Sequence, residues 1–142
     1  MSLIEILEEN ENKEPPVKIE TIISDYGVVI EYIPLNKING MCLMWSKNWY
    51  IAINNFLPEN KRRFTLAHEF AHVIQEDTWF SSYLISKFDS KEIEADNFAS
   101  KILIPEKALL EQLEYTQDVW VPAKIFNVEK NIIKTRIRNL KF

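Results

Sequence analysis

The sequence predicts an α+β fold in which a small antiparallel sheet of about three strands packs against helices and a helical C-terminal part follows. Runs rich in β-branched and aromatic residues, which favour strands, are confined to residues 28–53. Apolar residues at helical spacing occupy most of the chain on either side. The chain has 142 residues, of which 46% are hydrophobic, and this suits one domain with one core. We therefore expect residues 1–142 to form a single domain.

Two short helices are expected ahead of the strands. The first lies within residues 1–14, an N-terminal helix or arm with apolar side chains at helical spacing. A polar stretch that ends in two prolines separates it from the second helix, over residues 17–26. Gly27 follows directly, at a position where glycine commonly ends a helix.

Three strands are expected next. Residues 28–33 form a β-branched and aromatic run that Pro34 ends. Residues 41–45 and 49–53 are apolar runs joined by a short polar segment, which is typical of a hairpin. Short connections between successive strands favour antiparallel pairing, so we expect an antiparallel sheet.

Two strong helices should follow the sheet. Pro58 opens the first, which continues with regular apolar spacing to residue 74. A less regular, aromatic-rich segment covers residues 76–88. The second helix is expected over residues 90–103, with Pro105 ending it.

The C-terminal part is expected to consist of short helices over residues 106–114, around 118–125 and over 129–140. Residues 118–142 resemble a helix-turn-helix, with the turn at Asn127. This end of the chain is basic, with Lys130, Lys134, Arg136, Arg138 and Lys141. Helix packing with a solvated basic face explains it most simply, and DNA binding is the alternative.

Composition narrows the function classes. The net charge of -4 gives no global basic field of the kind that attracts nucleic acid. A single cysteine, Cys42, rules out an intramolecular disulfide and indicates a reducing compartment. The N-terminus is acidic, unlike a signal peptide, and no apolar run approaches the roughly 18 residues of a membrane span. We therefore expect a cytoplasmic protein without a membrane anchor.

The chemistry of the chain is concentrated in His68-Glu69-Phe70-Ala71-His72, an HExxH motif. On a helix, positions i and i+4 share one face, so His68 and His72 can direct both imidazoles at one ion. Glu69 can then act as general base on a water molecule. The chain has only two histidines, and both fall in this motif. The motif therefore predicts a zinc site.

Zinc needs a third protein ligand, and with both histidines used it must be a carboxylate or Cys42. Among the acids of the second strong helix, Glu92 aligns with the buried stripe, whereas Glu94 projects about 100° away from it. We favour Glu92 and leave Glu94 as the alternative. Asp96, one turn along, is expected to accept a hydrogen bond from a ligating histidine.

Two sequence blocks, residues 63–72 and 92–105, together resemble the ImmA/IrrE family of metallopeptidase-like proteins. The spacing of Glu92, Ala95 and Asp96 also resembles the glutamate-ligand pattern of gluzincins, which supports Glu92 by analogy. One departure is Ala71, where the family usually has glycine.

The resemblance implies a zinc protein that inactivates a helix-turn-helix repressor of a phage, mobile element or stress regulon, by cleavage in members with established activity. We predict a zinc metallopeptidase with His68, His72 and Glu92 as ligands and Glu69 as catalytic base. The alternative is a non-catalytic zinc protein that binds a repressor, or DNA through residues 118–142. We expect the cleft between a sheet edge and the motif helix. Tyr83, in the irregular segment, is a hypothesis for the oxyanion stabiliser.

Overall fold

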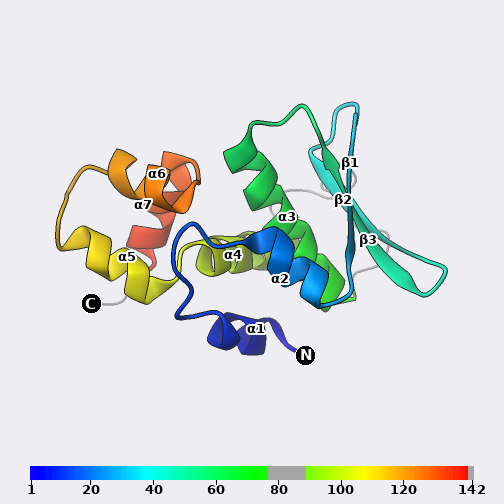
Figure 1. Cartoon of the computed structure of the whole chain (residues 1–142), viewed down its shortest axis with the longest axis horizontal. Coiled ribbons are helices and arrows are strands. Elements are labelled where there is room, and N and C mark those ends of the chain that lie inside the picture. Colours follow the sequence, from blue (N-terminus) through cyan, green and yellow to red (C-terminus); the bar gives the residue numbers. More distant parts are fainter. Residues whose placement is uncertain (77–88, 141–142) are drawn as a thin grey trace.

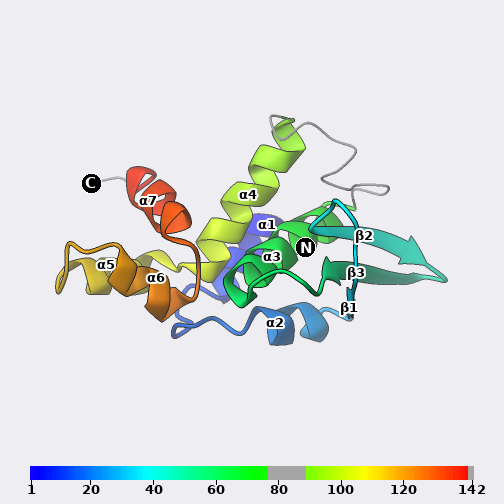
Figure 2. The same ribbon diagram turned by 90° about the horizontal axis from the view of Figure 1, so that it is seen from above.

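A computed structural model of the protein describes residues 1–76 and 89–140. It confirms the predicted α+β class, with a three-stranded sheet, seven helices and a helical C-terminal part within those residues. The sheet lies at one end of the molecule and helices α5–α7 at the other (Figure 1). Helices α3, Glu59–Ile74, and α4, Ser90–Leu103, lie between them and pack against each other (Figure 2).

The sheet consists of β1, Val29–Ile33, β2, Gly40–Trp45, and β3, Asn48–Asn54, in the order β1-β3-β2. Strands β2 and β3 form the predicted antiparallel hairpin. The prediction of an antiparallel sheet is wrong for β1, which pairs parallel to β3. The chain reverses direction between β1 and β2 and again between β2 and β3, so β3 runs parallel to β1. Because β3 lies between β1 and β2, the sheet is mixed. Strand β2 is therefore an edge strand.

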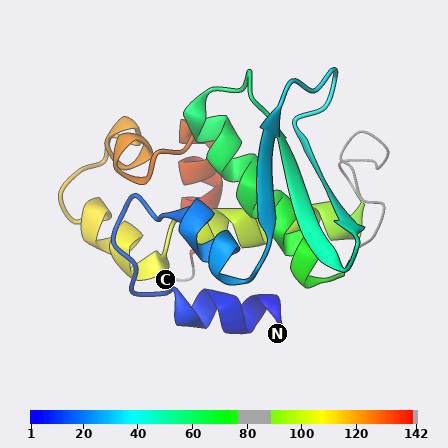
Figure 3. The ribbon, with the colours of Figure 1, turned by 45° about the vertical axis from the view of Figure 1, so that its right-hand side comes forward.

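Helix α3 covers one face of the sheet, where Ile51 and Ile53 are fully buried. The strands lie in front of α3 in Figure 3. Alternation along the strands turns another set of side chains to the opposite face. This outer face carries Val29, Glu31, Ile33, Leu43, Trp45 and Tyr50.

The two N-terminal helices complete the core. Helix α1, Leu3–Glu9, begins with a capping box between Ser2 and Glu5 and contacts α4. Helix α2, Ile19–Asp25, contacts both α3 and β1. The ring centroids of Phe70 in α3 and Phe98 in α4 lie 6.1 Å apart. This aromatic contact stabilises the packing of the two long helices.

The C-terminal part contains α5, Glu106–Leu113, α6, Trp120–Phe126, and α7, Lys130–Arg138. The turn between α6 and α7 falls at Asn127, which has a left-handed conformation with φ of 54°. No helix in the described part of the chain is long and apolar enough to cross a membrane.

Two cations of the basic end serve the fold itself. Arg136 is buried, and its Nε donates to the carbonyl oxygen of Ile104 at 3.1 Å, just past α4. The Lys130 ammonium lies 4.7 Å from the centre of the Trp120 ring. These contacts favour helix packing for part of the basic face, while Lys141 lies outside the described residues. DNA binding stays an untested alternative.

Gly40 sets how closely β2 approaches α3, and we expect a Gly40→Ala variant to be destabilised by about 1–3 kcal/mol. An added Cβ would lie 2.8 Å from Thr65 Cγ2, 3.0 Å from Ile53 Cδ1 and 3.1 Å from the carbonyl oxygen of Ala52. Chemical denaturation measures the change in unfolding free energy. Met44→Ala is the control, because Met44 is exposed in the same strand and should change stability by only about 0.5 kcal/mol. Equal stability of wild type and Gly40→Ala would contradict this packing.

Candidate metal centre

Helices α3 and α4 bring His68, His72 and Glu92 into one buried cluster, with ligand atoms that all lie within 4.8 Å of one another. The two Nε2 atoms of the histidines are 3.2 Å apart. Glu92 reaches both: its Oε1 lies 2.9 Å from His72 Nε2, and its Oε2 lies 2.9 Å from His68 Nε2. Two nitrogens and a carboxylate thus converge on one point.

Local sequence explains this convergence. His68 and His72 stand four residues apart on α3, so they share the face that meets α4. Glu92 lies in the first turn of α4, on the same side as buried Ala95. Small buried residues on both helices allow the close approach that the cluster needs, namely Ala67, Ala71, Ala95 and Ala99.

The cluster fits a zinc ion. Bonds of about 2.0–2.1 Å in a tetrahedral site keep ligand atoms roughly 3.3 Å apart. The separations of 2.9–3.2 Å in the cluster need only a small expansion to match this. The His₂Glu donor set is also one that catalytic zinc sites use. This chemistry supports a metal site, and the identity of the ion stays a prediction.

The alternatives for the third ligand lie elsewhere. Glu94 is exposed and accepts a hydrogen bond from Gln75. Cys42 is buried on β2 and is not in the cluster found among the described residues. Of the candidates that the sequence left open, the structure brings Glu92 to the two histidines.

Asp96 takes the position expected for a supporting carboxylate. Its Oδ1 accepts a hydrogen bond from His68 Nδ1 at 2.7 Å, which leaves Nε2 of that ring directed at the cluster. Burial alone would lower the pKa of His68, but hydrogen bonds to Asp96 and Glu92 outweigh it and raise the pKa to about 10. Burial likewise opposes the charged form of Glu92, yet the pKa of this carboxyl is lowered because both histidines hydrogen-bond to it.

Metal binding is expected to release a proton from His68. The raised pKa of about 10 means that the metal-free protein holds this proton at neutral pH. An ion binds neutral imidazole, so zinc affinity should fall about tenfold for each pH unit below that pKa. The same shift stabilises the metal-free fold: the contribution is full below pH 6.5 and is lost as pH rises through about 10.

Calorimetry of zinc binding at pH 7 in PIPES and in TES, two weakly zinc-binding buffers that differ in ionisation enthalpy, measures the released proton. Asp96→Asn is the informative variant, because it removes the strongest of the interactions that raise the pKa of His68. The Asp96→Asn protein should release fewer protons on zinc binding than the wild type. Equal heats in both buffers for the wild type would contradict the expectation.

Glu69 lies next to the cluster and is 1% exposed. Neither carboxylate oxygen has a hydrogen-bond partner of good geometry among the described residues. Burial, aided by the charge of Glu92, raises the pKa of Glu69 to about 7, although His68 and the Cys42 thiol act in the opposite direction. A thiol is a weak donor, so this contact leaves the carboxylate largely unsatisfied. The group is therefore poised to exchange a proton near neutral pH.

A cleft of about 150 Å³ opens onto these groups between α3, α4 and the start of β2. This agrees with the expected position beside a sheet edge. The residues that line it are Asn39, Phe64, Thr65, His68, Glu69, Glu92 and Asp96. Asn39 belongs to no motif, and sequence reasoning missed it. Tyr83, the hypothesis for the oxyanion stabiliser, lies outside the described residues.

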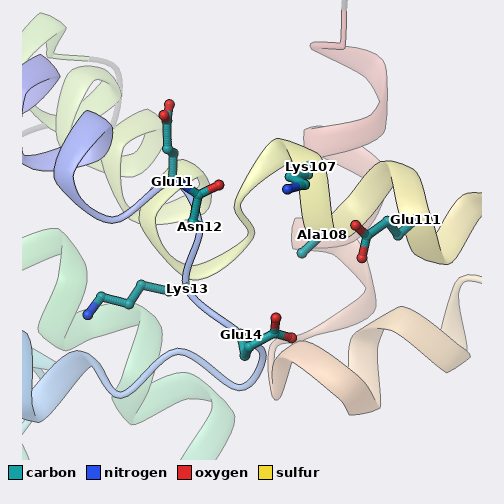
Figure 4. A pocket seen from close by; sticks show the side chains of 7 residues that line it. All are labelled: Glu11, Asn12, Lys13, Glu14, Lys107, Ala108 and Glu111. Atoms are coloured by element: carbon teal, nitrogen blue, oxygen red, sulfur yellow. The ribbon is translucent and has the colours of Figure 1, made fainter.

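A second hollow, about 60 Å³, lies where residues 11–14 face α5 (Figure 4). Its walls carry Glu11, Glu14 and Glu111 together with two lysines. It contains neither histidine nor cysteine, and no group of metal-ligating side chains is found there among the described residues. The chemistry of the described chain is therefore concentrated at the α3–α4 cluster.

An α+β domain with an HExxH helix, a glutamate from the following helix and a cleft at a sheet edge has the architecture of a metallopeptidase domain. The chain belongs to the peptidase M78 family, the IrrE N-terminal-like domain, whose model matches residues 23–138. This confirms the family resemblance seen in the sequence.

Solved structures support the fold. A Mycobacterium tuberculosis transcriptional regulator superimposes with a TM-score of 0.72 at 14% sequence identity. The match covers 99% of this chain and 48% of that protein, so the chain spans about half its length. At this identity the likeness shows the fold alone. A comparison with curated proteins gives no match.

Proposed function

We propose that the protein is a zinc-dependent endopeptidase that acts on a helix-turn-helix repressor of a phage, mobile element or stress regulon. The observation that carries the proposal is the buried His68, His72 and Glu92 cluster beside Glu69, a buried carboxylate without a good hydrogen-bond partner in the described part of the chain. Burying such a charge is costly, and a catalytic role accounts for it.

In this proposal His68 and His72 hold zinc through their Nε2 atoms and Glu92 through its carboxylate. Bound zinc supplies a Lewis acid that polarises the scissile carbonyl and makes water more acidic. Glu69 takes a proton from the attacking water and returns it to the nitrogen of the leaving amine. Asp96 keeps the His68 ring in position through the hydrogen bond at Nδ1.

The substrate is proposed to bind as an extended segment along β2. This strand lies at the edge of the sheet, so the described chain leaves one row of its backbone groups without a strand partner. An added peptide strand would satisfy these groups and lie across the cleft that contains Glu69. The choice of a repressor as substrate rests on the family.

The direct test uses zinc-loaded protein and the purified helix-turn-helix repressor encoded nearest to its gene. Mass spectrometry should detect two repressor fragments after incubation, and none after zinc is removed. The alternative is a non-catalytic zinc protein that captures the repressor, or that binds DNA through residues 118–142. In that region a left-handed turn at Asn127 separates two helices, as in a helix-turn-helix. Binding without cleavage would support capture, and salt-dependent binding of duplex DNA would support the DNA alternative.

A further inference from the structure

We propose that Asn39 is a substrate-binding residue whose side-chain amide donates a hydrogen bond to a main-chain carbonyl of the peptide in the cleft. This inference rests on the proposed peptidase function. It assigns a role to a residue outside the HExxH and glutamate motifs, at the position where the chain enters the edge strand β2.

Hydrogen-bond donors that a ligand could use are scarce among the described side chains that line the cleft. When ionised, the carboxylates of Glu69, Glu92 and Asp96 can only act as acceptors. The His68 ring is engaged with Asp96 and Glu92. The Thr65 hydroxyl already donates to the carbonyl oxygen of Lys61 at 2.8 Å.

Asn39 is different. Within residues 1–76 and 89–140, no hydrogen bond is formed by its side-chain amide. Of the described side chains that line the cleft, it is the neutral donor still available to a ligand.

The backbone of the loop that carries Asn39 is held by both the side chain and the backbone of Asn54, at the end of β3. The Asn54 Nδ2 group donates to the carbonyl oxygens of Leu35 at 3.0 Å and Ile38 at 3.2 Å. The Asn54 backbone N–H donates to the carbonyl oxygen of Asn39 at 2.8 Å. Asn54 Oδ1 in turn accepts from the backbone N–H of Phe56 at 3.1 Å. The backbone at Asn39 is thus held before any ligand arrives, which lowers the entropic cost of binding through the exposed side chain.

Gly40 completes the arrangement. The absence of a Cβ lets the start of β2 lie directly against Thr65 on α3, the wall of the cleft. Any larger residue would push the strand, and Asn39 with it, away from that wall. Gly40 and the Asn54 contacts therefore fix the backbone at Asn39 from both sides.

The chemistry fits a peptide main chain. A peptide presents carbonyl acceptors and N–H donors, and a primary amide offers both complements. The acids around the cleft cannot donate to a carbonyl when ionised, so a neutral donor supplies what they lack. Asn39 also immediately precedes the edge strand β2. A peptide bound as a strand along β2 would therefore pass Asn39 where it extends beyond the start of β2.

Two hydroxamates test the inference with the zinc-loaded protein. Acetohydroxamate reports on the metal centre alone, whereas an N-acetylated trialanine hydroxamate also places a peptide main chain in the cleft. Calorimetry should show that Asn39→Ala binds the trialanine compound about threefold to tenfold more weakly, the effect of one neutral hydrogen bond. Its affinity for acetohydroxamate should equal that of the wild type.

Two further variants show whether an effect is specific to Asn39 and its loop. Asn36→Ala alters an exposed residue of the same loop that does not line the cleft, so both affinities should be unchanged. Asn54→Asp removes the Nδ2 donors that hold the loop, so it should weaken the trialanine compound selectively.

Three outcomes overturn the inference. In the first, wild type and Asn39→Ala bind the trialanine compound with equal affinity; in the second, Asn39→Ala binds both compounds more weakly by the same factor. In the third, the wild type binds acetohydroxamate but not the trialanine compound. Failure of the wild type to bind either hydroxamate would overturn the proposed function itself. The two failures are therefore distinguishable.

Discussion

The Glu69→Gln variant is expected to lose about 10²–10⁴-fold in kcat while it binds zinc as tightly as the wild type. Glutamine has nearly the same shape but cannot accept the proton of the attacking water. The Glu69 carboxylate lies beside the ligand cluster without belonging to it, so the metal should stay in place. Repressor cleavage and zinc content measure the two effects separately.

The same substitution should leave the fold as stable as the wild type or more so. It removes a buried charge that has no good hydrogen-bond partner within residues 1–76 and 89–140, and such a charge raises the free energy of the folded state. Glu59→Gln is the matched control, because Glu59 is an exposed glutamate of the same helix and lies outside the cleft. Its activity should be unchanged. Cleavage by Glu69→Gln at the wild-type rate would remove Glu69 from the mechanism.

The Glu92→Gln variant is expected to lose zinc affinity by a factor on the order of 10² or more, because a charged ligand becomes a neutral amide. The paired variant Glu94→Gln should bind zinc like the wild type, since Glu94 is exposed and faces Gln75. Competition against a chelator of known affinity measures both. Normal binding by Glu92→Gln together with loss in Glu94→Gln would reverse the assignment.

The helices and strands were predictable because their sequence signals agree with their tertiary environment. Pro58 and Pro105 stand at helix boundaries in both the sequence and the structure. The turn at Asn127 was likewise found where the sequence indicated it. Proximity of His68 and His72 followed from helical spacing, and Glu92 was favoured over Glu94 by its alignment with the buried stripe.

The pairing of β1 was not predictable from local sequence. Strand composition does not specify a partner, and short connections favour neighbours in sequence, whereas β3 lies between β1 and β2. The role of Asn54 was also hidden, because its hydrogen bonds join segments 16 and 19 residues apart. The environment of Glu69 depends on His68 in α3, Glu92 in α4 and Cys42 in β2, which tertiary packing brings together and no periodicity reveals.

X-ray absorption spectroscopy of the zinc-loaded protein tests the central claim most directly, since it identifies the atoms around the ion. The expected first shell contains two imidazole nitrogens at about 2.0–2.1 Å and carboxylate oxygen at about 2.0–2.2 Å, with no sulfur near 2.3 Å. The imidazole signal should be absent in a protein that lacks both His68 and His72. A sulfur scatterer, which only Cys42 or a methionine could supply, or a shell without two imidazoles would contradict the His68, His72 and Glu92 site.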